Sequence, residues 1–256
     1  MSDILAIIPA RGGSKGVPKK NIKPLAGNPL IAYTIREAKK SQYISRIIVS
    51  TDCEETVEIA KQYGVEAPFV RPKELSRDNV QDFPVCEHAI KTLSEQGGFV
   101  PDMIAWLRPT SPLRKVKHID EAIEILMANP AGDSVRSLCL APKHPLKMWK
   151  VVSDRLAPFV PTEVTGIKEP YNYPRQELPP AYVQNGAIDV VRAKTIIEKR
   201  SISGDVILPY IMGAVYSINI DTELDFLFAE LLMNENFRSP LITELKCINK
   251  KLSNAS

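Results

Sequence analysis

The chain has no long hydrophobic run. Nowhere in its 256 residues does it approach the roughly 18 consecutive apolar residues that a membrane-spanning helix needs. Its first residues, Met1-Ser2-Asp3, include an acid in place of a basic start, and no small-residue cleavage site follows the first apolar run. We therefore expect a protein with no membrane partner and no secretion signal, located in the cytoplasm.

Cysteine and histidine are also scarce. The cysteines are four scattered residues without a CxxC pair: Cys53, Cys86, Cys139 and Cys247. This spacing argues against a structural zinc site or a disulfide framework and is typical of a reducing compartment. Only three histidines are present, and no Ser-His-Asp constellation can be recognised.

Acidic residues are nearly absent from the start of the chain. Although the net charge is only +3, residues 1–50 hold nine lysines and arginines against two acids, so the remainder is net negative. Five of these cations fall between Arg11 and Lys23 with no acid among them. A nucleic-acid-binding surface would spread its cations more widely, so we expect a local anion site and no nucleic-acid partner.

Strand-like and helix-like segments alternate along most of the chain. Apolar runs predict strands at 4–8, 46–50, 66–70, 103–107 and 134–140, and helical spacing occurs at 30–40, 54–63, 82–96 and 116–127. Further strands are expected at 187–191, 206–208 and 214–218, and helices at 193–199 and 222–236. These βα units predict an α/β fold, a three-layer α/β/α sandwich with a mostly parallel, Rossmann-like sheet.

The regular alternation stops between Ala141 and Tyr182, where eight prolines occur. A long proline-rich segment inside a compact domain usually forms a lid, a binding loop or a dimer arm. We interpret 141–182 as such an insertion in a domain spanning 1–238, followed by a polar tail at 239–256.

The first strand-to-helix connection, PARGGSKGVPKKN at residues 9–21, carries the clearest chemical signal. Ligands of open α/β sheets bind beyond the carboxyl ends of the strands. Its glycines could take up positive φ and turn backbone amides toward an anion, while Arg11 and Lys15 add charge. The loop is neither GxGxxG nor GxxxxGK[ST]. Phosphate binding is favoured over a solvated basic loop.

The run IIPARGGSKGVPKKNIKPLAGNPLIAYTI resembles the N-terminal signature of acylneuraminate cytidylyltransferases, which make CMP-sialic acid and related CMP-sugars. Further matches follow in order at Ile48–Asp52, Arg71-Pro72, Pro109–Arg114, Pro174–Gln176, Asn185–Ile188 and Ile220–Leu224. The resemblance covers about residues 4 to 230. CMP-Kdo synthetases are a poorer match, because their first loop lacks the GGSKG pattern.

The resemblance implies a set of residues around CTP. Arg11 and Lys15 would hold the phosphates and take part in catalysis. Arg175 of the insertion would also take part in catalysis. The nucleotide site would comprise Ala10, Arg11, Gly12, Gly13, Ser14, Lys15, Asn21 and Arg71. Two alternatives remain open, because Asn21 could simply close the turn and Arg71 could be a surface charge.

The sugar site is expected to comprise Arg108, Arg175, Gln184 and Asn185. Many sialic-acid enzymes carry glutamine where this chain has Arg108, so the identity of the sugar is open. An arginine fork there could grip a carboxylate. Without the resemblance, Arg175 would be interpreted as a surface cation, and Gln184-Asn185 as a turn.

Magnesium is the expected cofactor. Family members commonly carry aspartate at two alternating strand positions, but here these positions are Asn219 and Asp221. We assign both to the metal, although Asp221 could instead N-cap the last helix. Asp52 is similarly expected to cap the helix beginning at Glu54, while Arg114 is either a structural partner or an active-site charge.

We therefore expect a CTP-dependent cytidylyltransferase that transfers CMP to the anomeric hydroxyl of a nine-carbon keto sugar acid and releases pyrophosphate. The resemblance also implies a homodimer, formed through the insertion. The alternatives are a nucleotidyltransferase for a sugar 1-phosphate and a non-catalytic nucleotide-binding protein. The sequence identifies no general base.

Overall fold

The computed structural model describes residues 2–233. The expected helix end at 236, the domain boundary at 238 and the polar tail lie outside these residues. A six-stranded sheet forms the centre, with the order β10-β6-β9-β5-β1-β4. Its strands are β1 (Ile4–Pro9), β4 (Arg46–Ser50), β5 (Met103–Trp106), β6 (Ser134–Leu140), β9 (Tyr182–Arg192) and β10 (Ile207–Ile211).

β9 is the one strand of this sheet that runs against its neighbours. It lies antiparallel between β5 and β6, with Ala105 opposite Val190 and Val135 opposite the same residue. The pairs of β1 with β4, β1 with β5 and β10 with β6 are all parallel. The sheet is thus mostly parallel, as predicted, and the fold class is confirmed.

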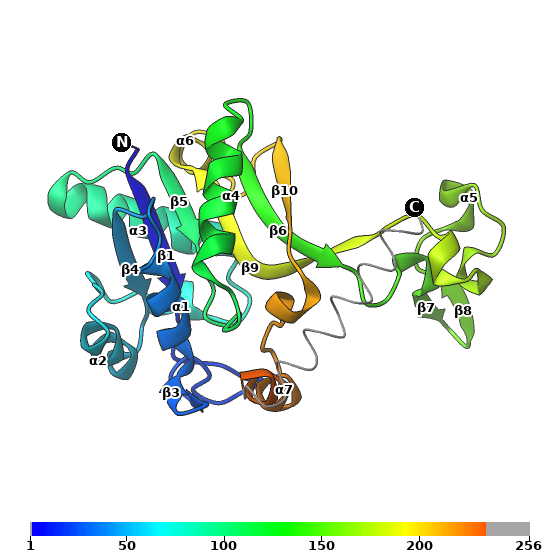
Figure 1. The fold of residues 1–256 in the computed structure, drawn as a ribbon, viewed down its shortest axis with the longest axis horizontal. Helices are drawn as coiled ribbons and strands as arrows, with labels where there is room; N and C mark the ends of the chain where they lie inside the picture. Colours follow the sequence, from blue (N-terminus) through cyan, green and yellow to red (C-terminus); the bar gives the residue numbers. More distant parts are fainter. Residues whose placement is uncertain (1, 234–256) are drawn as a thin grey trace.

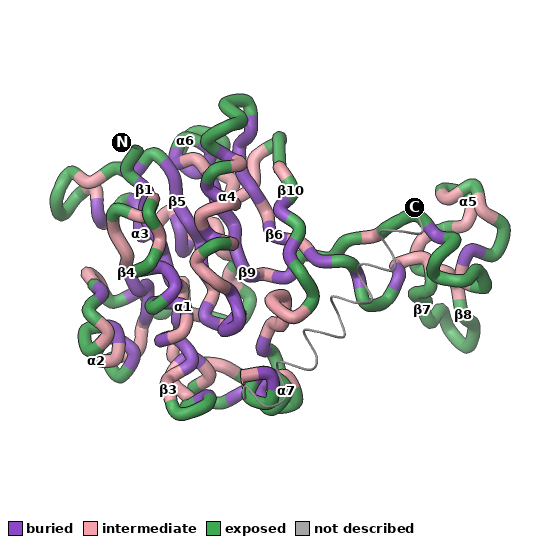
Figure 2. Tube along the Cα trace, in the orientation of Figure 1, coloured by how far each residue is buried: buried purple, intermediate pink, exposed green. Residues whose placement is uncertain are grey.

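Helices cover both faces of the sheet because the strand side chains alternate between two apolar cores (Figures 1 and 2). Ile4, Ala6 and Ile8 of β1 face the core that contains α1 (Leu30–Ala38), α2 (Glu54–Gln62) and α4 (Val116–Ala128). Leu5 and Ile7 face the core that contains α3 (Asp82–Gly97) and α6 (Ala193–Ile197). The three layers follow from this alternation.

The proline-rich segment forms an arm that projects from the sheet (Figure 1). The outer halves of β6 and β9 form its stalk, and Leu140 lies opposite Tyr182 at its far end. The arm contains a hairpin, β7 (Trp149–Val152) and β8 (Arg155–Pro158), and the single helical turn α5 (Thr162–Thr165). Prolines start the short 3-10 turns at Pro145–Lys147 and Pro170–Asn172.

Two predicted strands are wrong. Residues 66–70 make only two isolated parallel bridges, Glu66 with Ile48 of the edge strand β4 and Val70 with Thr51 just after it. These two bridges do not form a continuous ladder, so the segment is not a strand of the sheet. Residues 214–218 were expected to be a strand, but Ala214–Ser217 is a 3-10 turn, so no strand leads into the expected metal residues Asn219 and Asp221.

A third, small core lies beneath the first loop. It joins Val17, the hairpin of β2 (Pro24–Leu25) and β3 (Asn28–Pro29), and the last described helix, α7 (Glu223–Met233). Ile220 and Phe226 complete it. The loop and residues 218–226, about 200 positions apart in the chain, therefore pack as one unit. Within residues 2–233, no helix combines the length and apolar character needed to cross a membrane.

Candidate active site

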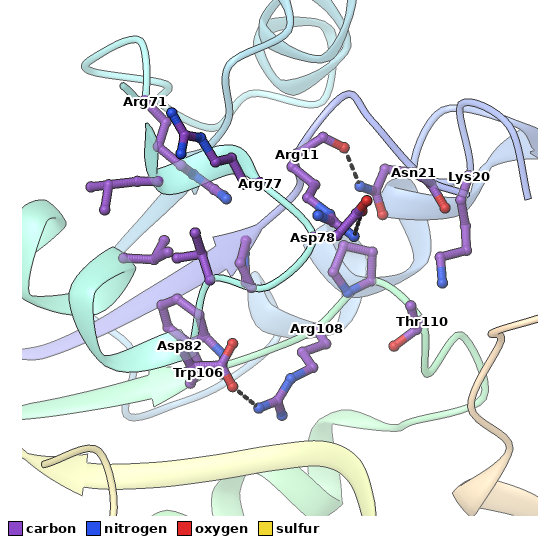
Figure 3. A pocket seen from close by; sticks show the side chains of 16 residues that line it. Arg11, Lys20, Asn21, Arg71, Arg77, Asp78, Asp82, Trp106, Arg108 and Thr110 are labelled. Atoms are coloured by element: carbon purple, nitrogen blue, oxygen red, sulfur yellow. Dashed lines mark hydrogen bonds and ion pairs between the residues drawn. The ribbon is translucent and has the colours of Figure 1, made fainter. Parts of the chain in front are cut away.

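A cleft of about 240 Å³ opens beyond the carboxyl ends of β1 and β5 (Figure 3). This is the edge of the sheet at which the sequence places the anion site. Five cations line the cleft (Arg11, Lys20, Arg71, Arg77 and Arg108). Only two carboxylates, Asp78 and Asp82, accompany them. The surplus of positive charge suits a polyanionic ligand.

The loop after β1 presents backbone amides that the chain itself does not use. The Ala10 amide donates to the Ser50 carbonyl, and the Gly12 amide donates to the Asp52 carboxylate at 2.8 Å. By contrast, the amides of residues 13–16 have no hydrogen-bond acceptor in the described part of the chain. A row of unsatisfied amides beside Arg11 and Lys15 is an anion-binding arrangement.

The glycines serve this loop in a different way from the one expected. None of Gly12, Gly13 and Gly16 has a positive φ. A Cβ at Gly12 would lie 2.8 Å from the Cβ of Cys53, and one at Gly16 would lie 2.1 Å from the Asp221 carbonyl oxygen. These two glycines are therefore required for close packing, while Gly13 has open space around it.

Asp52 does not cap the following helix, so that prediction is wrong. Cys53 is the N-cap residue of α2, with no side-chain cap hydrogen bond, and Asp52 instead accepts the Gly12 amide. The carboxylate of Asp52 thus fixes the start of the loop to the end of β4.

The two cations that were expected to bind phosphate, Arg11 and Lys15, share one carboxylate. Arg11 contacts Asp78 Oδ1 at 2.8 Å, and Lys15 contacts Asp78 Oδ2 at 2.7 Å (Figure 3 shows the first pair). The hydrogen bond from Lys15 is the main reason that the pKa of Asp78 lies below its ordinary value. Asp78 is therefore an anion held by the residues that were predicted to hold phosphate.

Asn21 and Arg71 both line the cleft. Asn21 Nδ2 donates to the Arg11 carbonyl at 2.9 Å, so it does close the turn, and its Oδ1 is left for a ligand. Arg71 is 4% exposed and donates to Ser50, which excludes a surface charge. Burial lowers the pKa of Arg71 to about 10, because no carboxylate pairs directly with it in the described residues.

Arg108 faces the cleft two residues after β5, but its charge is already matched. It pairs with Asp82 and, at 2.8 Å, with Asp189, which is 3% exposed and also binds Arg136 at 2.9 Å. Arg108 Nη1 additionally donates to the Gly186 carbonyl. Because two carboxylates balance its charge, this guanidinium can offer a ligand N–H groups as hydrogen-bond donors but little net positive charge.

The remaining predicted sugar residues are spread more widely. Gln184 is exposed on the stalk, opposite Leu138. The Asn185 amide is buried and used within the chain, since it accepts from Ser137 and donates to Ser217 at 2.9 Å. Arg175 lies in the arm, where it donates to the Ala141 carbonyl. Within one chain, Arg175 is absent from the residues that line the cleft.

Asn219 and Asp221 lie in an irregular segment next to the loop. Asn219 Nδ2 donates to Asp221 at 2.6 Å, and Lys20 lies 3.5 Å from the other carboxylate oxygen. The alternative in which Asp221 caps the last helix is wrong, because Thr222 caps α7 by accepting the Asp225 amide. Asp221 therefore keeps a carboxylate that is 68% exposed beside the cleft.

Several residues that line the cleft were not identified from the sequence. Lys20 ties the loop to the Ile220 carbonyl at 2.6 Å, and Asp78 and Asp82 reach the cleft from a segment with no motif. Arg114 is structural: it is buried and donates to the Ala187 carbonyl and to Thr34, both at 2.6 Å. Burial lowers its pKa to about 9. These are contacts between distant segments, which a linear pattern does not reveal.

Comparison with known proteins identifies the family to which this chain belongs. A family model described as cytidylyltransferase matches residues 5–152, more than half of the chain, and the chain belongs to the cytidylyltransferase family.

Characterised relatives extend the match over nearly the whole chain. A CMP-N,N'-diacetyllegionaminic acid synthase of Legionella pneumophila is 35% identical, over 91% of this chain and 97% of that protein. A pseudaminic acid cytidylyltransferase of Campylobacter jejuni is 32% identical, over 92% of this chain and 98% of its own. An N-acylneuraminate cytidylyltransferase of Escherichia coli is 32% identical over 93% of this chain, which spans 54% of that protein.

A solved structure supports the fold. The CMP:2-keto-3-deoxy-manno-octonic acid synthetase complexed with CTP aligns with a TM-score of 0.67, over 92% of this chain and 100% of that one. Its sequence identity is 16%, so the likeness is one of architecture. The family model and the relatives above confirm the family expected from the sequence motifs, and this structure confirms the fold.

Proposed function

We propose that this protein transfers CMP from CTP to the anomeric hydroxyl of a nine-carbon keto sugar acid and releases pyrophosphate. The observation that carries the proposal is the loop after β1, where the amides of residues 13–16 are not used by the chain and Arg11 and Ser14 line the cleft. The three relatives above, named for sialic-type sugar acids, support this substrate class.

In this reaction the anomeric hydroxyl loses its proton to solvent and its oxygen forms a bond to the α-phosphorus, while the bond from that phosphorus to the bridging oxygen of pyrophosphate breaks. Arg11, Lys15 and the amides of 13–16 would take up the negative charge that develops on the departing pyrophosphate. Asn21, Arg71 and Ser14, all lining the cleft, would orient the nucleotide. Catalysis would come from positioning and charge neutralisation.

The residues present could hold a magnesium ion only together with the phosphates of the substrate. No three His, Cys, Asp or Glu side chains converge as a metal site anywhere in residues 2–233, but Asp221 offers an exposed carboxylate beside Lys20. Mg²⁺ is commonly held by one or two carboxylates together with substrate phosphates. We assign Asp221 as its ligand, with Asn219 supporting it; the ion, when bound, neutralises phosphate charge.

We place the sugar acid beside Arg108 and the start of β9. A Cβ at Gly186 of β9 would lie 4.0 Å from Arg108 Nη1 and 3.8 Å from Asn219 Oδ1, so these two groups flank Gly186. Their N–H and amide groups suit the hydroxyl, acyl and carboxylate groups of such a sugar. Gln184 and Asn185 directly precede Gly186 in the chain. Hydrogen bonds to Ser137 and Ser217 hold the side chain of Asn185 in place.

We further propose a homodimer in which the arm supplies Arg175 to the partner's cleft. The arm exposes apolar side chains, including Val151 at 75% and Val164 at 77%, which supports burial against a second copy. Arg175 is separated from the cleft of its own chain. The free thiols of Cys53, Cys86 and Cys139 are consistent with a cytoplasmic location.

The deciding experiment is a panel of keto sugar acids with CTP and magnesium, monitored for pyrophosphate. Sialic, legionaminic and pseudaminic acids would be compared with sugar 1-phosphates. We expect release with at least one free keto acid, and loss of release in Arg11→Ala. Arg46→Ala, which removes an arginine paired with Glu66 away from the cleft, is the matched control. Release only with a sugar 1-phosphate would contradict the proposal.

A non-catalytic nucleotide-binding protein is the second candidate, and Asn219 is the observation that favours it. Such a protein would bind CTP at the same loop yet release no pyrophosphate at any magnesium concentration. Calorimetric titration of CTP beside the turnover panel separates the two functions.

A further inference from the structure

Asp78 lies opposite the loop, on the segment that follows the 3-10 turn Lys73–Ser76. Both of its carboxylate oxygens are used, one by Arg11 at 2.8 Å and the other by Lys15 at 2.7 Å. Arg11 also reaches the Ser76 carbonyl at 3.5 Å. One carboxylate thus spans the two cations to which the proposed function assigns the CTP phosphates.

A phosphate group cannot share these cations with Asp78 without strong like-charge repulsion. Binding of a polyphosphate therefore requires Asp78 to leave them. Asp78 is 42% exposed, so its ion pairs are weak and its carboxylate regains hydration when it leaves the two cations. In addition, a phosphate gains the amides of residues 13–16, which Asp78 does not contact. Asp78 and a phosphate group can therefore replace each other on Arg11 and Lys15. The phosphate has more hydrogen-bond donors available to it than Asp78 has, because it can also use the amides of residues 13–16.

We propose that Asp78 is a competing counter-ion of this reaction: it yields Arg11 and Lys15 to the incoming triphosphate and takes them back as pyrophosphate leaves. This inference rests on the proposed function, because it identifies pyrophosphate as the product released. Asp78 acts through Arg11 and Lys15 and is a positioning residue. Its effect is to weaken the hold on pyrophosphate and so to speed product release.

The test is calorimetric titration of inorganic pyrophosphate into the full-length wild type and into Asp78→Asn. Loss of two exposed ion pairs corresponds to binding tighter by about 3- to 30-fold. Asp78→Glu, which keeps the charge, should bind as the wild type does. Asp205→Asn is the matched control, since Asp205 is an exposed carboxylate that pairs with Lys199 and does not line the cleft.

In turnover, Asp78→Asn should lower the KM for CTP, lower kcat and strengthen inhibition by added pyrophosphate. Equal or weaker pyrophosphate binding by Asp78→Asn, or the same gain in Asp205→Asn, would overturn the inference even if the sugar panel shows turnover. Tighter binding specific to Asp78→Asn supports the counter-ion even if no sugar acid reacts, in which case only the proposed function fails.

Discussion

Gly16 packs against the backbone of Asp221, close enough that a Cβ at Gly16 would lie 2.1 Å from the Asp221 carbonyl oxygen. The phosphate loop and the assigned metal residue are therefore positioned by one contact, which Lys20 reinforces by donating to the Ile220 carbonyl at 2.6 Å. A side chain at position 16 must push the two segments apart.

Gly16→Ala should accordingly destabilise the protein by about 1–3 kcal/mol, as overpacking of a close contact does, and weaken CTP binding. Denaturant unfolding and calorimetric titration of CTP would measure both effects. Gly13→Ala is the matched control, because a Cβ there meets nothing within 4 Å and the glycine has no positive φ. Equal stability of the two variants would contradict the role assigned to Gly16.

Asn219→Asp should make magnesium act at lower concentrations. The amide of Asn219 now lies 2.6 Å from an oxygen of Asp221, so the substitution places a second carboxylate beside the first. Ligand charge tunes the affinity of oxygen sites for divalent cations, and we expect half-maximal pyrophosphate release at an Mg²⁺ concentration about 3- to 10-fold lower. Without metal, the two like charges should lower thermal stability.

The control for this change is Asn28→Asp, which adds the same charge where the side chain accepts a hydrogen bond from Arg36. An unchanged magnesium requirement in Asn219→Asp would remove position 219 from the metal site. Turnover that rises from near zero would instead identify the natural chain as the non-catalytic homologue.

Mixing two inactive variants should restore activity if Arg175 serves the partner's cleft. Arg11→Ala inactivates its own cleft, whereas Arg175→Ala inactivates the cleft of the other subunit. Heterodimers then contain one cleft with both arginines, so that an equal mixture should reach about a quarter of wild-type activity. Pyrophosphate release after co-refolding measures this. A mixture as inactive as its components would place Arg175 in the cleft of its own chain or outside catalysis.

The stability of the fold should depend on pH through Asp133. Lys199 and the amides of Asp205 and Val206 donate to this carboxylate and hold its pKa well below the ordinary range. Since its pKa is depressed in the folded state, Asp133 contributes stability above the unfolded value of about 3.9 and loses that contribution as the pH falls below it.

Asp133→Asn should therefore lower the urea midpoint at pH 7, and the gap from the wild type should narrow steadily below about pH 4. Urea titrations between pH 3 and pH 7 would follow this gap. Asp205→Asn, which removes the exposed partner of the same lysine, should have little effect. A gap that stays constant with pH would assign the effect of Asp133 to packing.

The sequence predicted the features that depend on local patterns. The continuous apolar run in Ile4–Pro9 indicates a strand buried on both faces, and the glycine-rich loop after it could be located from composition alone. It did not predict the direction of β9, because an apolar run is the same in a parallel and an antiparallel strand. Nor did it predict the partners of Asp52 and Asp78, which depend on segments that meet only after folding.

The reversed strand β9 also determines when the sheet can be completed. In the described sheet, the neighbours of β6 are β9 and β10, both of which follow it in the chain. While the ribosome makes the arm, β6 therefore has no partner strand and β5 has one free edge. At about 5–20 residues per second, this nascent chain remains open for several seconds, an interval in which chaperones would have their main opportunity to act.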